Sequence, residues 1–256
     1  MSIGSQKNET IEKVLILLQF IVQCLALILF RVFFKLEVRG KDRALAELAA
    51  ARLQDKGLLF ASNHISEWDA IMVRCALPFG AFMFPMYYVA MTKEHYQDDK
   101  FGWRKYFYGG TLFKMLGAYP AYLGMRDYQA SLVNHIELLE YGKSICIFPE
   151  GKISINTAKP GEAKGGIGFL AEYTHTNIIP VTLEGFGDIS WSKVFLVLLG
   201  RRQKVSVIYQ DMLNIDEVLH LAEEKGIAKG IDTNKFVGSY VMDKIRSGLT
   251  SVTPEK

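Results

Sequence analysis

The sequence predicts a layered α/β domain with a mostly parallel or mixed central sheet, preceded by an N-terminal membrane-associated helix. Two observations indicate this architecture. Short apolar runs alternate with longer helix-like segments from residue 58 onward, and a nearly unbroken apolar segment stands close to the N-terminus. Strands that alternate with helices are typical of a sheet covered by helices. No segment between residues 58 and 210 resembles a linker, so we expect a membrane-anchoring region over residues 1–40 and one domain over residues 41–256.

The N-terminal apolar segment runs from Val14 to Phe30 and is interrupted by Gln19 and Gln23. A helix of this length measures about 26 Å, slightly less than the ~30 Å hydrocarbon core of a bilayer. Basic residues follow it without a small-residue cleavage site, which argues against a cleaved signal peptide. We expect membrane attachment, by a spanning or an in-plane helix, with a helix buried in a soluble core as the alternative. If the helix spans, the excess of Lys and Arg after it predicts a cytoplasmic domain.

The composition narrows the class of protein. Half of the residues (50%) are hydrophobic, and the net charge is +3. A charge this small does not indicate nucleic acid as a partner, but it fits weak attraction to an anionic membrane surface or ligand. Cys24, Cys75 and Cys146 lie in apolar contexts and lack metal-ligand or paired spacing. They indicate a reducing compartment and no disulfide framework.

The remaining elements follow in chain order. A segment rich in Ala, Leu, Arg and Glu begins at Lys41 and stops at Gly57, which predicts a helix. After it, short apolar runs predict strands, and longer segments with apolar residues three or four positions apart predict helices. The expected strands cover residues 58–62, 82–91, 118–123, 144–148, 178–184 and 204–209, and the expected helices cover residues 68–77, 104–116, 128–141, 165–173, 216–224 and 234–247.

An acidic residue stands five positions after a histidine in the segment from Asn63 to Asp69, where the strand at residues 58–62 gives way to a helix. Ser66 suits the N-cap position, so Asp69 falls in the first helical turn and its side chain points back toward the preceding loop. A carboxylate there can hold one ring nitrogen of His64 and leave the other free to take a proton, as in a general-base dyad. A capping box formed by Ser66 and Asp69, beside a structural histidine, is the alternative.

A second polar segment follows the strand at residues 144–148. Glu150, Gly151 and Lys152 stand at its carboxyl end, where ligands gather in α/β sheets. The loop at residues 154–164 then leads into a helix, and a helix N-terminus with Lys152 and Lys164 nearby could bind a phosphate. An exposed turn and a solvated basic loop are the alternatives.

Two familiar motifs are disfavoured. Gly166-x-Gly168-x-x-Ala171 imitates a dinucleotide fingerprint, but no strand runs directly into Gly166, so we expect no nucleotide site. The chain has no Gly-x-Ser-x-Gly segment, which disfavours a serine hydrolase. A metal-dependent hydrolase that uses His64, Asp69 and Glu150 as ligands is a minor alternative.

Four blocks occur in a fixed order along the chain: His64 to Asp69, Gly117 to Arg126, Phe148 to Gly151, and Ile179 to Val181. Together with the apolar N-terminus, they resemble the glycerolipid acyltransferase family, and most closely the bacterial 1-acylglycerol-3-phosphate acyltransferases. The resemblance covers residues 58–185, which include all four blocks.

The resemblance implies roles for particular residues. His64 is expected to be the catalytic base, and Asp69 is expected to orient it. Lys152 and Ile153 stand where family members commonly carry Thr or Ser followed by Arg, so the cation that would meet an acceptor phosphate lies one position earlier. The expected substrate-binding residues are Asn63, Gly117, Arg126, Glu150, Gly151, Lys152, Lys164 and Pro180, and Lys93 falls at another position where the family often carries lysine.

The reaction implied by the resemblance moves a fatty acyl group from acyl-CoA or acyl-carrier protein to the sn-2 hydroxyl of 1-acylglycerol 3-phosphate, giving phosphatidic acid. It needs no metal or cofactor, because the thioester is already activated. Its partners are lysophosphatidic acid, the acyl thioester and membrane lipids, at the cytoplasmic side of the cell membrane. An enzyme of this fold with another lysophospholipid or aminolipid acceptor, and a non-catalytic membrane lipid-binding protein, are the alternatives.

Overall fold

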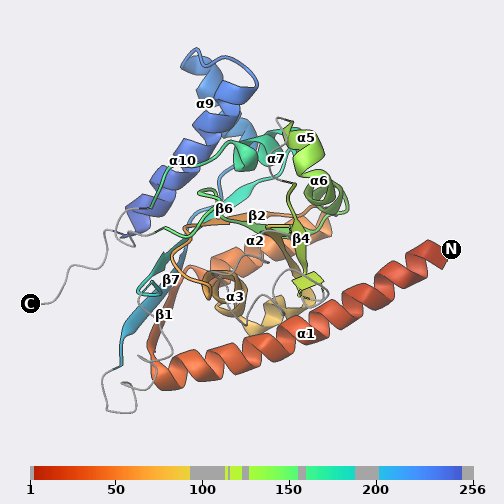
Figure 1. The fold of residues 1–256 in the computed structure, drawn as a ribbon, viewed down its shortest axis with the longest axis vertical. Helices are drawn as coiled ribbons and strands as arrows, with labels where there is room; N and C mark the ends of the chain where they lie inside the picture. The colour runs from red at the N-terminus through yellow and green to blue at the C-terminus, as the bar shows by residue number, and fades with distance from the viewer. Residues whose placement is uncertain are drawn as a thin grey trace, which may run out of the picture.

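The computed structural model describes residues 3–92, 113–114, 116–122, 127–154, 160–187 and 202–249. At the centre of these residues is a seven-stranded sheet in the order β1-β7-β6-β2-β5-β3-β4 (Figure 1). The strands are β1 (Lys35–Arg39), β2 (Leu59–Ser62), β3 (Met86–Ala90), β4 (Ala118–Pro120), β5 (Ser144–Ile147), β6 (Ile178–Glu184) and β7 (Lys204–Tyr209).

Strand direction makes the sheet mixed, which confirms the predicted fold class. The strands β6, β2, β5, β3 and β4 run parallel, whereas β7 pairs antiparallel with β6 and carries β1 parallel beside it. The carboxyl ends of β2, β5 and β6 therefore meet at one edge of the sheet, which we call the carboxyl edge. The amino edge lies opposite. Ligand sites of α/β sheets form at the carboxyl edge.

Helices cover both faces of the sheet (Figure 1). The helices α1, α2 and α3 pack against one face, and α6, α7, α9 and α10 pack against the other. The helices are α1 (Ile3–Phe33), α2 (Lys41–Leu53), α3 (Asp69–Cys75), α5 (Tyr128–Ser131), α6 (Val133–Glu140), α7 (Gly166–Thr174), α9 (Ile215–Glu224) and α10 (Ile231–Leu249), with a 3₁₀ turn, η1, at Phe79–Met83.

Residues on the central strands alternate between two hydrophobic clusters. Phe60 and Cys146 pack toward α1, α2 and α3, whereas Leu59 and Ile145 pack toward α7 and α10. This alternation follows from the period of two in a strand. Every residue of β2 and β5 is buried, as expected for parallel strands that have helices on both faces.

Several expected elements differ from the structure. The strand β1 lies inside residues 1–40, the region expected to be a membrane anchor, and it pairs with β7 in the central sheet. Its alternating sequence (Lys-Leu-Glu-Val-Arg) is typical of a strand at the edge of a sheet. The strand expected from residue 82 starts at Met86, because η1 occupies the residues before it. Leu132 divides the helix expected over residues 128–141 into α5 and α6. Most of the helix expected over residues 104–116 lies outside the described residues.

The helix α1 lies along the domain and is held there by buried polar side chains (Figure 1). The Gln19 amide donates to the carbonyl of Met86 at 2.5 Å and accepts the N–H of Met86 at 3.0 Å. The Gln23 amide donates to the carbonyl of Leu77 at 3.0 Å. Both glutamines are buried, so the two polar residues that interrupt the apolar segment anchor α1 to the domain.

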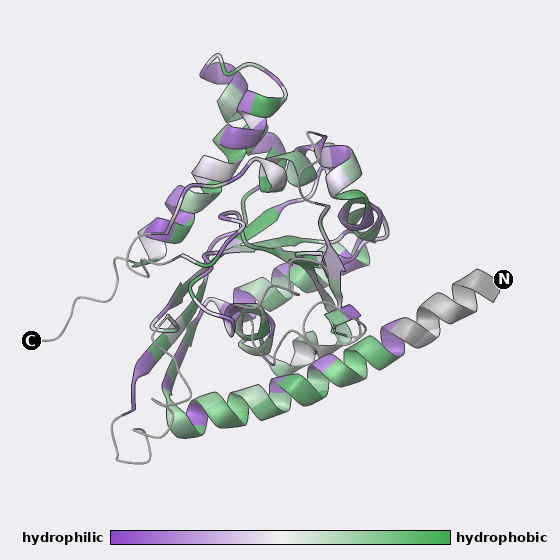
Figure 2. Ribbon diagram, viewed as in Figure 1, coloured by the Kyte–Doolittle hydropathy of each residue, from purple (hydrophilic) through white to green (hydrophobic). Residues whose placement is uncertain are grey.

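The opposite face of α1 remains apolar and exposed. In Figure 2, the coloured part of this helix is mostly hydrophobic and lies outside the sheet and its other helices. By length and composition, the segment Glu12–Phe33 could cross a membrane. The exposed apolar side chains recur every three or four positions and are Val14, Leu17, Ile21, Leu25, Ile28 and Val32, which we call the outer stripe.

Candidate active site

The turn between β2 and α3 builds a histidine–aspartate pair at the carboxyl edge. The regular helix begins at Asp69, and Ser66 organises the turn before it. The Ser66 hydroxyl accepts the N–H of Trp68 at 3.2 Å and donates to Asp69 Oδ1 at 2.6 Å. Asp69 Oδ2 in turn accepts the N–H of Ser66 at 2.8 Å. This reciprocal bonding resembles a capping box, but Trp68 is the N-cap of α3 and Ser66 lies two residues before it, so the expected N-cap position of Ser66 is wrong.

The capping geometry also aims the carboxylate of Asp69 at His64. Asp69 Oδ2 lies 3.0 Å from His64 Nδ1 and also accepts the N–H of Ile65 at 2.5 Å. The Asp69 side chain is fully buried, whereas 21% of the His64 side chain is exposed. With a proton on Nδ1 facing the carboxylate, Nε2 is the nitrogen left to accept a proton. The capping and catalytic interpretations are therefore compatible, since one carboxylate performs both tasks.

The ring of Phe148 fixes the His64 imidazole from a second direction. The two rings stack with centroids 4.1 Å apart and planes 17° apart. Phe148 follows β5 directly, so the strand places this ring beside the end of β2. No role of its own was expected for Phe148, although it begins the Phe-Pro-Glu-Gly block. A polar-motif search misses such a residue because its contribution is a ring face and not a polar atom.

Glu150 connects this turn to the loop before α7. Its carboxylate accepts the N–H of His64 through Oε1 at 3.0 Å and the N–H of Gly161 through Oε2 at 2.7 Å. The Glu150 residue is only 3% exposed. Both oxygens therefore accept backbone N–H groups, and the expected contact of Glu150 with substrate stays a prediction.

Two lysines stand at the carboxyl edge beside the Glu150 turn. Gly151 adopts φ +64°, and a Cβ added to it would lie 3.1 Å from Lys164 Nζ, so the Lys164 amine packs over this glycine. Lys152 is exposed on the same turn. The N–H of Ser154 donates to the carbonyl of His64 at 2.6 Å, which keeps this segment against the dyad. Neither lysine has an ion pair within the described ranges, so both are available to an anionic ligand.

Three residues expected to bind substrate are engaged elsewhere. The buried Asn63 amide bonds the carbonyl of Leu183 at 2.9 Å and its N–H at 2.8 Å, which joins the end of β2 to β6. Pro180 is buried inside β6 beside Ala61. Gly117 precedes β4 and therefore lies at the amino edge, where its φ of +87° allows close approach to α1. Sheet packing engages Asn63 and Pro180, and helix docking engages Gly117, so their expected substrate contacts stay predictions.

Arg126 and Lys93 lie outside the described residues. The arrangement does not fit a metal site made of His64, Asp69 and Glu150, because both oxygens of Glu150 accept backbone N–H groups, and Asp69 Oδ2 already faces His64 Nδ1 and two backbone N–H groups. Across the ranges that the structure describes, no cluster of three His, Cys, Asp or Glu side chains could hold a metal ion.

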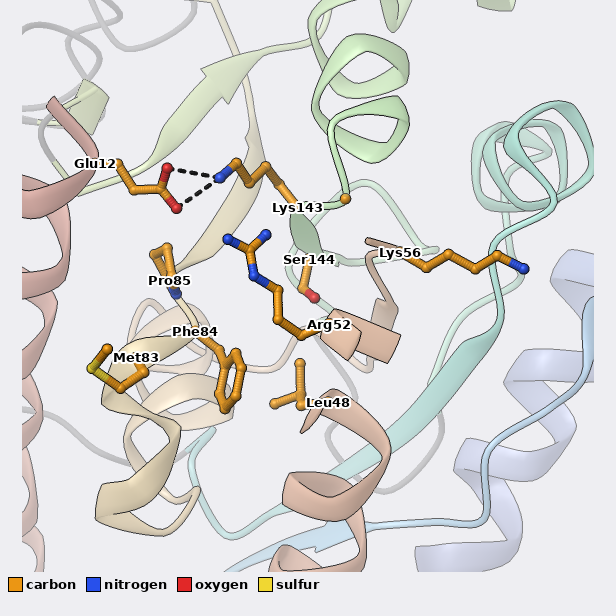
Figure 3. A pocket seen from close by; sticks show the side chains of 10 residues that line it. Glu12, Leu48, Arg52, Lys56, Met83, Phe84, Pro85, Lys143 and Ser144 are labelled. Atoms are coloured by element: carbon orange, nitrogen blue, oxygen red, sulfur yellow. Dashed lines mark hydrogen bonds and ion pairs between the residues drawn. The ribbon is translucent and has the colours of Figure 1, made fainter. Parts of the chain in front are cut away.

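Two cavities lie away from the dyad. The one drawn in Figure 3 is at the amino edge, where Lys143 binds both carboxylate oxygens of Glu12 at 2.7 Å and the Arg52 side chain points toward this ion pair. Its volume of about 20 Å³ is enough for roughly one water molecule. A second cavity of about 200 Å³ lies between α1 and residues 76–79 and has a mainly apolar lining. Neither is lined by His64.

Comparison with known proteins agrees with this geometry. A family model described as Acyltransferase matches residues 35–184, which is more than half of the chain and includes the dyad and the Glu150 turn. The crystal structure of the 1-acyl-sn-glycerophosphate (LPA) acyltransferase PlsC from Thermotoga maritima is similar to this chain with a TM-score of 0.55 and 18% sequence identity. The similarity covers 95% of this chain and 81% of that one. At this identity, the likeness shows the fold.

Proposed function

This chain belongs to the acyltransferase family, and on that premise we propose that it moves a fatty acyl group from acyl-CoA or acyl-carrier protein to the sn-2 hydroxyl of 1-acylglycerol 3-phosphate. The product is phosphatidic acid. The family and the PlsC-like fold support glycerolipid acyltransferase activity. The observation that carries the proposal is the dyad, in which a buried Asp69 carboxylate lies 3.0 Å from Nδ1 of a partly exposed His64.

The proposed mechanism uses His64 as a general base. Nε2 takes the proton from the acceptor hydroxyl, whose oxygen attacks the thioester carbonyl. The C–S bond breaks, the sulfur leaves with the bonding electron pair, and the imidazolium returns a proton to it. Asp69 stabilises the imidazolium while it exists. No acyl-enzyme forms because the acceptor is itself the nucleophile. Base catalysis of this kind contributes a factor of roughly 10² to 10⁴ to the rate. The scheme requires no cofactor besides the acyl donor.

Lys152 and Lys164 support a phosphate-bearing acceptor. Both stand beside the Glu150 turn at the carboxyl edge, and the Lys164 amine lies against Gly151. A phosphate held there would bring the glycerol hydroxyl of the same molecule toward His64. Arg126 stays a candidate for the same phosphate on the strength of the family resemblance alone.

The outer stripe of α1 supports attachment to a membrane, where the acceptor and the product reside. We propose that α1 lies in the membrane plane, because Gln19 and Gln23 hold it against the domain while its opposite face is apolar. An in-plane helix with one apolar face inserts that face into the headgroup and acyl boundary. Free cysteines suit the reducing cytoplasmic side.

An acceptor panel tests the substrate. Purified wild-type protein receives acyl-CoA or acyl-carrier protein and one of four acceptors: 1-acylglycerol 3-phosphate, a lysophosphatidylcholine, an ornithine lysolipid or a monoacylglycerol. We expect the first acceptor to give the highest kcat/KM. Preference for monoacylglycerol would refute the role of the lysines in binding phosphate. Preference for another lysophospholipid or for the aminolipid supports the alternative acceptors, and tight lipid binding without any acyl transfer supports the non-catalytic alternative.

A further inference from the structure

The C-terminal helix α10 reaches the dyad through one arginine. Arg246 Nη2 donates to the carbonyl of Gly161 at 2.9 Å, and Nη1 pairs with Asp243 at 2.7 Å one turn earlier on the same helix. The contact with Gly161 joins residues 85 positions apart in the sequence. Arg246 also lies beyond residues 35–184, the range that the family model matches.

Gly161 links Arg246 to Glu150, which in turn binds the backbone of His64. The peptide groups on either side of Gly161 supply both interactions: its carbonyl accepts from Arg246, and its N–H donates to Glu150 Oε2 at 2.7 Å. The other oxygen of Glu150 accepts the N–H of His64 at 3.0 Å. A continuous series of hydrogen bonds therefore runs from Arg246 through Gly161 and Glu150 to the backbone of His64.

The end of α10 that carries Arg246 is hydrogen-bonded to β6 and to Gln210, the residue after β7. The Thr182 hydroxyl donates to the carbonyl of Ile245 at 2.8 Å, and the Gln210 amide donates to the carbonyl of Lys244 at 2.6 Å. A side chain at Gly248 would collide with Thr182 Oγ1, so this glycine permits the close approach. Figure 1 shows α10 running along the side of the sheet beside β6. Arg246 therefore extends from a part of α10 that is hydrogen-bonded to the sheet.

Gly161 lies close to the Glu150 carboxylate, and the shape of Arg246 suits its two partners. A Cβ added there would lie 3.0 Å from Glu150 Oε2, closer than nearly all real contacts of this kind, so a side chain would push the carboxylate away. The Arg246 guanidinium is planar and offers several donors in a fixed fork, which lets it bind a carbonyl and a carboxylate at once. A lysine at this position has a single ammonium group to divide between them.

We propose that Arg246 is a positioning residue for the dyad, which acts by fixing Gly161 so that Glu150 holds the His64 backbone in register with Asp69. This role rests on the proposed base function of His64. Displacement of a catalytic group by about 1 Å can cost roughly 10²-fold in rate. Loss of the Arg246 contact is therefore expected to lower kcat by about tenfold or more, with little effect on the KM of the acceptor.

The test compares Arg246→Gln and Gly161→Ala with a matched control. Arg43→Gln removes the same pair of contacts elsewhere, since Arg43 donates to the carbonyl of Tyr209 at 3.2 Å and pairs with Asp211. Initial rates give kcat and KM for each variant in the same membrane preparation. We expect Arg246→Gln and Gly161→Ala each to lose at least about tenfold in kcat. Arg43→Gln is expected to keep the wild-type kcat. The conservative variant Arg246→Lys is expected to recover part of the loss.

A second measurement does not depend on activity. Amide hydrogen exchange reports the N–H groups of His64 and Gly161, which both bind Glu150. We expect faster exchange at both amides in Arg246→Gln and unchanged exchange at them in Arg43→Gln. Faster exchange in a wild-type-like fold that has no transferase activity would support the positioning contact and refute the proposed function. Unchanged exchange, an unchanged kcat, or an equal loss of kcat in Arg43→Gln would each overturn the proposal.

Discussion

Replacing Asp69 by Asn removes the negative charge beside the His64 ring while keeping the size and shape of the side chain. The carboxylate accepts three N–H groups through Oδ2, from His64, Ile65 and Ser66, and one hydroxyl through Oδ1. An Asn whose oxygen takes the place of Oδ2 can still accept the N–H groups. Its NH₂ group then replaces Oδ1 and the Ser66 hydroxyl can no longer donate to it, so Asp69→Asn removes the charge and this one bond while keeping the three N–H bonds.

The expected loss follows from the geometry of the pair. The Nδ1 to Oδ2 distance is 3.0 Å, and the charge centres of the two groups lie somewhat further apart. Two unit charges about 4 Å apart interact by about 4 kcal/mol at an effective dielectric constant near 20. That energy corresponds to about 10³ in rate if the imidazolium is fully formed in the transition state. Because the charge is only partly developed there, we expect kcat to fall by about 10²- to 10³-fold.

The assay is the initial rate of acyl transfer from acyl-CoA to 1-acylglycerol 3-phosphate at saturating substrate. Asp216→Asn is the matched control, since Asp216 also pairs with a histidine, at 3.2 Å from His175 Nδ1, but both side chains are 72% exposed. We expect this control to retain full activity. Thermal unfolding of each variant shows whether the fold is kept. A folded Asp69→Asn protein that retains more than half of the wild-type kcat would refute the role of the charge.

Three further predictions concern the site, the core and the membrane helix. Glu150→Gln places an NH₂ group opposite the N–H of His64 or of Gly161, so we expect a loss of about 1–3 kcal/mol in the free energy of unfolding and a lower kcat, measured by denaturant titration and initial rates. Burial lowers the pKa of His135 from 6.5 to about 4, so the unfolded chain binds the proton more tightly between these values. Stability should therefore fall by about 3 kcal/mol as the pH drops from 6.5 to 4, and His135→Leu should flatten that dependence in urea titrations; an unchanged slope would contradict it. Leu25→Glu with Ile28→Glu charges the outer stripe and should reduce co-sedimentation with phospholipid vesicles, whereas Leu53→Glu, 89% exposed on α2, should not; equal loss in both would reject the in-plane orientation.

Local sequence patterns predicted those parts of the fold that depend on local forces. The bounds of β6 and β7 agree with the expected strands residue for residue, because both are apolar runs with clear ends. The bonds between Ser66 and Asp69 and the direction of the Asp69 carboxylate also follow from a few adjacent residues, although the N-cap of α3 is Trp68. Strand β1 was missed because it directly follows the long apolar helix and its partner β7 lies far along the chain.

One physical reason explains why the surroundings of several site residues could not be predicted from the sequence. The family blocks indicate which residues matter, but the edge of the sheet at which each one lies depends on strand direction. Gly117 precedes its strand whereas His64 follows one, so the two lie at opposite edges. The buried partners of Asn63 and Glu150 likewise come from distant segments. Arg246 lies on the last helix and carries no motif, so only the folded chain connects it with the dyad.

The role of His64 as the general base is tested most directly by the acyl-transfer rates of His64→Asn and His175→Asn, measured with acyl-CoA and 1-acylglycerol 3-phosphate. Both substitutions remove the histidine of a His–Asp pair, and Asn suits the left-handed backbone of His175 at φ 48°. We predict that kcat falls by about 10²-fold or more in His64→Asn and does not fall in His175→Asn. Equal kcat values for His64→Asn and the wild type would contradict the assignment of His64 as the base.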